Sequence, residues 1–437
     1  MRRYITEFGA VGDGVTLNTQ ALQAAVDQCA AAGGGTVSVP PGIFVTGTVF
    51  LRSHIELHLE AGAVLKGSPR MADYCADDAY PQNGPCFKEG WRGAHLLAAV
   101  ACEDVTLSGP GTVDGNCDAF FTSGQVERVH GLCWARGVRI TDTAKVDYRP
   151  GQMIVFVQCR RVRVTDLNLR NSPCWSCFLH GCDEVIVRGC FIDNPVDGIN
   201  TDGIDIDCCT QVAVSDCVIR TGDDAITLRA SGRRLKDREA VCEDVTVSNC
   251  VLDSSVCGFR IGVGNGIIRH AVLSGIVMRY AGTGFLFQSS YGQQGAGVTM
   301  HDISVSNIRG HYMGAPVRIV AGSADTGKTR MRDIRIRDLH TRCAGNIEIE
   351  GGGGTRPEDI FFQDCTFDVV KRLYPGAPER LPAAFLKFSG AGRVVMRDCA
   401  LRWLDPDPEW RRTAAVDDVT DLELKDCSFP ELPGRPE

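Results

Sequence analysis

The segments Cys182-Asp-Glu-Val-Ile-Val-Arg-Gly-Cys190 and Cys209-Thr-Gln-Val-Ala-Val-Ser-Asp-Cys217 decide the fold of this chain, because they are two copies of one repeat. Each copy has two polar residues, then valine or isoleucine alternating with other residues, and then a closing cysteine. Period-2 alternation of this kind predicts a short strand with one buried face. Further copies, some of them weaker, begin at Cys102, Cys159, Cys242, His301, Met331, Pro357 and Asp421.

The spacing of these copies, from the twenties to the low thirties, leaves no room for a helix between them. Leucine-rich repeats have a similar period, but their regular leucine and asparagine positions are missing here. The repeat therefore predicts an all-β fold, a right-handed parallel β-helix in which each coil adds strands to long parallel sheets. We expect residues 1–437 to form one such domain, with cysteines stacked inside as small apolar side chains.

The two ends of the chain differ from the repeats. Residues 18–32 have apolar side chains at helical spacing and are followed by a run of glycines, so we expect an amphipathic helix. That helix would cover the open end of the β-helix, and residues from about 405 to 437 would form the C-terminal cap or tail.

Composition limits the partners and the compartment. The chain is 44% hydrophobic and 23% charged, with a formal net charge of -8 and no run of basic residues. We therefore expect no nucleic-acid partner and no membrane partner. Residues 1–10 lack a secretory signal, and an odd total of 21 cysteines suits reduced thiols, so we expect a cytoplasmic protein. The oligomeric state does not follow from the sequence.

The densest acidic stretch runs from Asp193 to Asp224 and contains Asp202, Asp205 and Asp223. When the repeat at Val212 is set beside that at Val185, Asp202 and Asp224 fall on adjacent coils. Parallel strands lie about 4.8 Å apart, so these carboxylates would be close, with Asp223 beside them.

Like charges at this spacing cannot all ionise easily, so we expect at least one carboxyl to keep its proton to higher pH. A protonated acid beside ionised partners is what glycosidic hydrolysis needs. A single aspartate at a coil turn is more often a backbone hydrogen-bond acceptor or a calcium ligand. Three converging aspartates favour a catalytic site.

Several motifs carry a resemblance to a known family. Asn200-Thr201-Asp202-Gly203 and Gly222-Asp223-Asp224, in this order, resemble the signature of the polygalacturonase family of glycoside hydrolases, family 28. Phe8 to Gly14, Gly34 to Gly42 and Asn171 to Trp175 also resemble that family. The resemblance implies an inverting hydrolase without cofactor or metal, in which Asp223 is the general acid and Asp202 and Asp224 activate water. Substrate contacts would come from Asn200, Trp175, Asp205, Arg229, Arg260, Gln288 and Tyr291.

Two motifs of the family are absent. Where the family has Gly-His-Gly, this chain reads Val256 to Gly262, so Val256 or Cys257 takes the place of the histidine. Where the family has Arg-x-Lys, this chain reads Gly284-Phe285-Leu286-Phe287-Gln288. Loss of both cations should weaken binding of a uronate in the cleaved subsites, so plain polygalacturonan is a doubtful substrate. Arg260, expected in the row next to Thr227, either replaces one cation or holds the acidic cluster together.

We therefore predict an exo-acting glycoside hydrolase for a pectic or related oligosaccharide, its one expected partner. Two alternatives remain at this point. A calcium-dependent polysaccharide lyase would use the aspartates as metal ligands and Arg229 or Arg260 as the base. A non-catalytic glycan-binding β-helix would need no crowded carboxylates.

Overall fold

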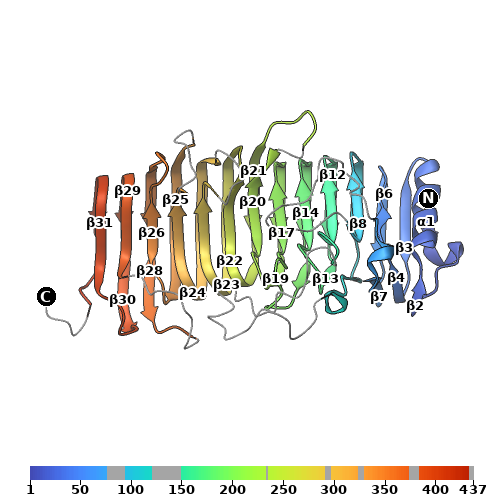
Figure 1. The fold of residues 1–437 in the computed structure, drawn as a ribbon, viewed down its shortest axis with the longest axis horizontal. Helices are drawn as coiled ribbons and strands as arrows, with labels where there is room; N and C mark the ends of the chain where they lie inside the picture. Colours follow the sequence, from blue (N-terminus) through green and yellow to red (C-terminus); the bar gives the residue numbers. More distant parts are fainter. Residues whose placement is uncertain are drawn as a thin grey trace. The chain divides into compact units, whose positions relative to one another are not determined.

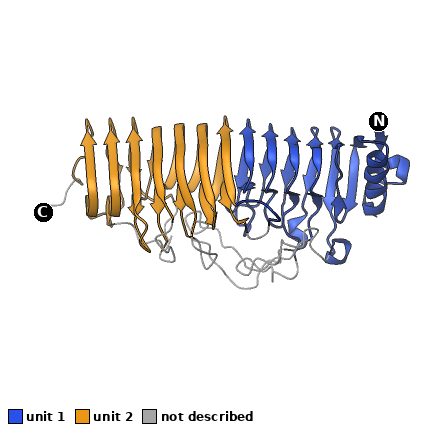
Figure 2. Cartoon of the chain, turned by 90° about the horizontal axis from the view of Figure 1, so that it is seen from above, with its two compact units in different colours: residues 1–128, 140–223, 233–239 blue, residues 129–139, 224–232, 240–437 orange. Residues whose placement is uncertain are grey.

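A computed structural model describes residues 1–75, 94–120, 149–232, 235–290, 297–322, 329–373 and 383–432. These residues fall into two compact units (Figure 2). Unit 1 comprises those within Met1–Arg128, Ile140–Asp223 and Arg233–Glu239, and unit 2 those within Val129–Arg139, Asp224–Gly232 and Ala240–Glu437. The expectation of a single domain stays a prediction.

Unit 1 consists of one α-helix, three short 3-10 helices and short strands, most of them of three to six residues. The helices are α1 (Thr19–Ala31), η1 (Ile5–Phe8), η2 (Met71–Asp73) and η3 (Cys117–Ala119). The strands are β1 (Arg2–Tyr4), β2 (Asp13–Leu17), β3 (Gly35–Val39), β4 (Gly42–Thr46), β5 (Val49–Phe50), β6 (Ile55–Leu59), β7 (Ala63–Gly67), β8 (Leu97–Val100), β9 (Glu103–Ser108), β10 (Thr112–Asp114), β11 (Ile154–Val157), β12 (Arg160–Thr165), β13 (Asn168–Arg170), β14 (Cys177–His180), β15 (Asp183–Arg188), β16 (Phe191–Asp193), β17 (Ile204–Asp207), β18 (Thr210–Ser215) and β19 (Val218–Thr221).

Every third strand of the repeats in unit 1 pairs in parallel (Figure 1), so each coil contributes one strand to each of three sheets. Val185 lies opposite Val162 on one side and Val212 on the other, as the repeat alignment predicts. The alternating valines are buried, while the residue before the first valine of each repeat, such as Glu184, has a positive φ and bends the chain at a coil corner. The all-β, right-handed parallel β-helix fold class is therefore confirmed.

The predicted N-terminal helix is also present. Helix α1 buries Leu22, Ala25, Val26 and Cys29 and packs against β3 and β5 at the N-terminal end of unit 1 (Figure 1). Its apolar face thus covers the first coil, where a β-helix would otherwise expose its core. No helix among the described residues is long and apolar enough to cross a lipid bilayer.

Unit 2 is a parallel β-helix of longer strands, several of which bend from one sheet into the next. They are β20 (Ile226–Ala230), β21 (Val241–Ser248), β22 (Val251–Gly264), β23 (Ile267–Gln288), β24 (Thr299–Val320), β25 (Met331–Cys343), β26 (Ile347–Glu350), β27 (Pro357–Gln363), β28 (Thr366–Val370), β29 (Ala384–Arg397), β30 (Ala400–Asp405) and β31 (Arg412–Lys425). Residues 412–425 thus form a strand paired with β29, and its largely exposed side chains end the unit.

Cysteines stack inside the coils as expected. Cys102, Cys159, Cys182 and Cys209 each precede residues that lie in register on β9, β12, β15 and β18. All four are buried free thiols that donate to backbone carbonyl oxygens. Burial removes them from solvent, so they act as part of the core.

Candidate active site

Two of the predicted catalytic carboxylates lie close together in unit 1. Asp202 precedes β17 and Asp223 follows β19, and their side chains are only 4% and 6% exposed. A carboxylate oxygen of Asp202 lies within 4.8 Å of one of Asp223. Two buried carboxyl groups at this distance do not both ionise easily. Their arrangement suits either an acid and base pair or a site that binds a cation.

The backbone around these aspartates is held by neighbouring hydroxyl groups. The backbone N–H and the Oγ of Ser176 both donate to the carbonyl oxygen of Asp202, at 2.9 Å each. Thr221 Oγ1 donates to the carbonyl oxygen of Asp223 at 2.7 Å. Because both main chains are fixed, the two carboxylates are presented with little freedom.

Gly222 allows the chain to reach Asp223. A Cβ at this position would lie 2.3 Å from the carbonyl oxygen of Gly198 and 2.5 Å from that of Pro195. The Gly222 N–H donates to Thr201 Oγ1 at 3.1 Å, and Thr201 in turn donates to Gly198. The turn before Asp223 is thus packed against the loop that leads to Asp202, at a distance that only glycine permits.

Arg149 is a site residue that the sequence did not reveal. Its side chain is 2% exposed, and its Nη1 donates to the carbonyl oxygens of Pro173 and Ile199, both at 2.9 Å. Its Nη2 donates to Asn200 Oδ1 at 2.9 Å. Arg149 therefore holds the loop that carries Asn200, which has a positive φ of 54°. None of the motifs includes Arg149, and its partners are mostly backbone oxygens.

Asn194 is a second residue that the motifs missed. Its Oδ1 accepts from the Ser172 N–H at 3.0 Å, and its Nδ2 donates to Ser176 Oγ at 2.7 Å and to the Thr201 carbonyl oxygen at 3.1 Å. This amide is buried and joins three segments around Asp202. Its conversion to an apolar residue would leave backbone groups unsatisfied.

Asp224 follows Asp223 directly in the chain and begins the Asp224–Gly232 segment of unit 2. It is 4% exposed, and its Oδ2 accepts a hydrogen bond of 2.5 Å from Arg260 Nε. Arg260 lies opposite Thr227, as predicted, and its side chain is largely buried. This ion pair supports the interpretation that Arg260 holds the acidic cluster. The stacking of Asp202 on Asp224 stays a prediction.

The other predicted substrate contacts lie in different environments. In unit 1, Trp175 is 3% exposed and packs edge-on against Phe178, and the buried Asp205 lies opposite Phe178 on the neighbouring strand. In unit 2, Arg229 is buried in β20, while Gln288 is half-buried and lies opposite Gly262 rather than Arg260. Tyr291 lies outside the described residues. Their roles in substrate binding stay predictions.

The positions where two family motifs are missing are apolar. Val256 and Cys257 belong to a buried cluster with Tyr280, Tyr312 and Leu286. Leu286, opposite Arg260, is itself 6% exposed. These side chains cannot bind a carboxylate by charge. The Cys174 and Cys177 thiols are free and buried, and burial raises the pKa of Cys177.

Comparison with known proteins identifies the class. The chain is 27% identical to a probable polygalacturonase of Vitis vinifera, over 97% of this chain and 86% of the relative. It is 28% identical to an exo-poly-alpha-D-galacturonosidase of Dickeya chrysanthemi, over 52% of this chain and 41% of the relative.

Solved structures share the fold. The family 28 exopolygalacturonase of Yersinia enterocolitica superposes with a TM-score of 0.70 at 18% identity, covering 96% of this chain and 78% of that one. The exopolygalacturonase of Thermotoga maritima has a TM-score of 0.60 at 19% identity, covering 99% and 93%. At these identities the likeness extends to the fold alone.

A β-helix with buried paired aspartates and relatives of this kind defines a glycoside hydrolase. The family model for glycosyl hydrolases family 28 matches residues 87–243, which include Asp202 and Asp223. Over these residues the chain resembles that family, and it lacks the family's Gly-His-Gly and Arg-x-Lys motifs.

Proposed function

We propose that this glycoside hydrolase cleaves a pectic or related oligosaccharide by acid and base catalysis, with Asp202, Asp223 and Asp224 as its catalytic residues. The observation that carries the proposal is the approach of Asp202 and Asp223, whose buried carboxylates lie within 4.8 Å of each other. Keeping two acids buried at this distance opposes folding, so a function that needs both is favoured.

Asp223 is proposed as the general acid, which protonates the leaving glycosidic oxygen. Asp202 and Asp224 are proposed to orient and deprotonate the attacking water. The short ion pair of Asp224 with Arg260 supports this division, because Arg260 holds the Asp224 carboxylate in one orientation.

We propose inversion at the anomeric carbon, as the family resemblance implies. The general spacing rule points the other way: inverting enzymes keep their two carboxyl groups about 6.5–9.5 Å apart, and retaining enzymes about 5–5.5 Å. The nearest oxygens of Asp202 and Asp223 are within 4.8 Å. That rule applies to sites with two catalytic carboxyl groups. Here we propose three, because Asp202 and Asp224 together activate the water and Asp223 is a separate acid.

The proposed substrate is an oligosaccharide other than plain homogalacturonan, cleaved from its end. Leu286 lies opposite Arg260, and Val256 and Cys257 have apolar surroundings. These apolar side chains support a subsite at the cleaved bond that makes no charged contact with a carboxylate. The name of the Dickeya relative, an exo-galacturonosidase, supports exo action. A cytoplasmic location would suit an enzyme that receives short glycans.

Product chromatography with a panel of pectic oligosaccharides and aryl glycosides, with and without EDTA, tests this proposal. A saturated reducing sugar released without metal is expected, and its identity names the substrate. Proton NMR of the first product should give the anomer opposite to that of the bond cleaved. A metal-dependent, unsaturated product that absorbs in the ultraviolet would show that the protein is a lyase. Binding of panel members without cleavage of any of them would show that it is a glycan-binding protein.

A further inference from the structure

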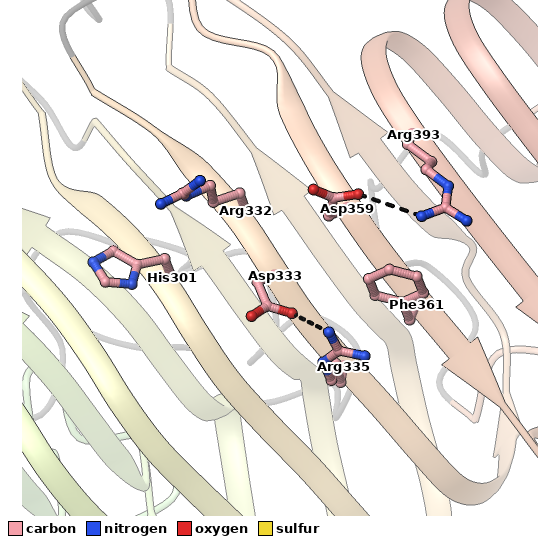
Figure 3. A pocket seen from close by; sticks show the side chains of 7 residues that line it. All are labelled: His301, Arg332, Asp333, Arg335, Asp359, Phe361 and Arg393. Carbon is pink, nitrogen blue, oxygen red and sulfur yellow. Dashed lines mark ion pairs between the residues drawn. The ribbon is translucent and has the colours of Figure 1, made fainter.

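A basic hollow lies on the outer face of unit 2. It has a volume of about 380 Å³ and is lined by side chains from β24, β25, β27 and β29 (Figure 3). His301 on β24 lies opposite Arg332 on β25, and Arg335 on β25 lies opposite Phe361 on β27. Adjacent parallel strands thus bring these side chains together on one surface.

This hollow is on a different sheet of unit 2 from the Asp224 and Arg260 pair. Arg260 lies opposite Leu286, which lies opposite Arg318 in the last part of β24. His301, in contrast, is in the first part of β24 and lies opposite Arg269 near the start of β23. The two sets of side chains therefore belong to separate rows, and the hollow needs an explanation of its own.

The arginines that line the hollow differ in their ion pairs. Arg335 pairs with Asp333 at 2.7 Å, and Arg393 makes a longer contact with Asp359 at 3.7 Å (Figure 3). Arg393 also lies 3.4 Å from Asp421 and 3.9 Å from Glu423. Arg332 is exposed and makes no ion pair with any residue in the described part of the chain. The Arg332 guanidinium is therefore available to an anion.

The arginine side chains are also oriented before any ligand binds. The guanidinium carbons of Arg335 and Arg393 lie 4.6 Å and 5.6 Å from the centre of the Phe361 ring. Stacking on an aromatic ring restricts a long side chain and leaves the edge of the guanidinium free to bind an anion through two hydrogen bonds. Burial and the charges of Arg332 and Arg269 lower the pKa of His301, which agrees with a positive local potential.

We propose that this hollow is a second binding site for an acidic oligosaccharide, whose carboxylate is bound by Arg332 with Arg335. The choice of a uronate-containing glycan rests on the proposed function. Asp333 and Asp359 support a singly charged, hydroxylated ligand, because they repel a doubly charged phosphate and accept hydrogen bonds from sugar hydroxyls. Such a site would hold an acidic chain on the enzyme without taking part in its cleavage.

Hydrogen exchange of the full-length protein with trigalacturonate as the probe tests the site directly. We expect the trisaccharide to slow amide hydrogen exchange in β25 and β27. In Arg332→Ala this protection should be weaker by about fivefold or more, given the usual strength of a charged hydrogen bond. Arg337→Ala is the matched control, since Arg337 is exposed on the same strand but does not line the hollow. The carboxyl-reduced trisaccharide should have no effect on these strands.

Three outcomes would overturn the inference: unchanged exchange in β25 and β27, equal protection in Arg332→Ala and the wild type, or equal protection by inorganic phosphate alone. Hydrolysis of a short substrate, measured in parallel, separates this site from the proposed function. Arg332→Ala should retain that activity. If no glycan is cleaved but Arg332-dependent protection by trigalacturonate persists, the hydrolase proposal fails and the binding site stands.

Discussion

Arg260 Nε donates a hydrogen bond of 2.5 Å to Asp224 Oδ2, and both side chains are largely buried. The resemblance left open whether Arg260 contacts substrate or holds the acidic cluster. An arginine bound this closely to a carboxylate fixes the orientation of that carboxylate. We therefore regard Arg260 as a positioning residue.

Arg260→Gln should lower kcat by about 10–100-fold, because a hydrogen bond between charged groups contributes about 1.5–3 kcal/mol. KM should change little, since a positioning residue does not bind the substrate. Steady-state kinetics on the cleaved oligosaccharide measure both values. Arg269→Gln is the control, as Arg269 pairs with Glu243 at 2.6 Å on another sheet of unit 2. A large rise in KM with constant kcat would instead assign Arg260 to substrate contact.

Arg149→Met should both destabilise the protein and reduce its activity. The change leaves the buried carbonyl oxygens of Pro173 and Ile199 without their donor and frees Asn200. Unsatisfied buried groups cost about 1–3 kcal/mol each, so we expect a loss of about 2–4 kcal/mol in the free energy of unfolding. Urea denaturation measures this loss. Arg160→Met, which removes a surface pair with Glu184, should cost less than about 1 kcal/mol; equal losses for the two variants would contradict the role of Arg149.

The Glu348 carboxylate should make stability depend on pH. Burial alone would raise its pKa, but Arg318 and Lys387, both 2.7 Å away, outweigh burial and lower the pKa below its ordinary value of 4.5. A lowered native pKa stabilises the fold above the pKa of the unfolded chain, and this stabilisation is lost as the pH falls through the native pKa.

Comparison of wild type and Glu348→Gln by urea unfolding between pH 7 and pH 3 checks this prediction. The variant should be about 1 kcal/mol less stable at pH 7, a modest value because the two cations are partly exposed and screened by solvent. The difference should shrink below pH 4. A difference that stays constant with pH would show that the pair does not carry the effect.

The fold could be predicted because its signal is periodic. Cysteines and valines recur at matching positions, and the alignment of Val185 with Val212 gives the observed register. The amphipathic pattern predicts a helix over residues 18–32, and α1 is observed at Thr19–Ala31. The two agree to within one residue at each end. The repeat pattern likewise predicts that Arg260 lies opposite Thr227, as observed. Each of these features depends on local sequence repeated from coil to coil.

Features without a repeat could not be predicted. Arg149 binds carbonyl oxygens that any residue supplies, so no residue type marks its partners. The hollow around Phe361 forms in the weaker copies, where outward side chains vary from coil to coil. Such features depend on which outward side chains meet in three dimensions.

The most direct test of the account is the rate of sugar release by Asp223→Asn. We predict a fall in kcat of about 10²–10⁴-fold, with KM nearly unchanged and no effect of EDTA, because asparagine keeps the shape of the side chain but cannot supply the proton. Asp193→Asn, on the same chain segment but exposed and paired with Arg220, should retain the wild-type rate. Undiminished release by Asp223→Asn, or release that requires a metal ion, would contradict the assignment of Asp223 as the general acid.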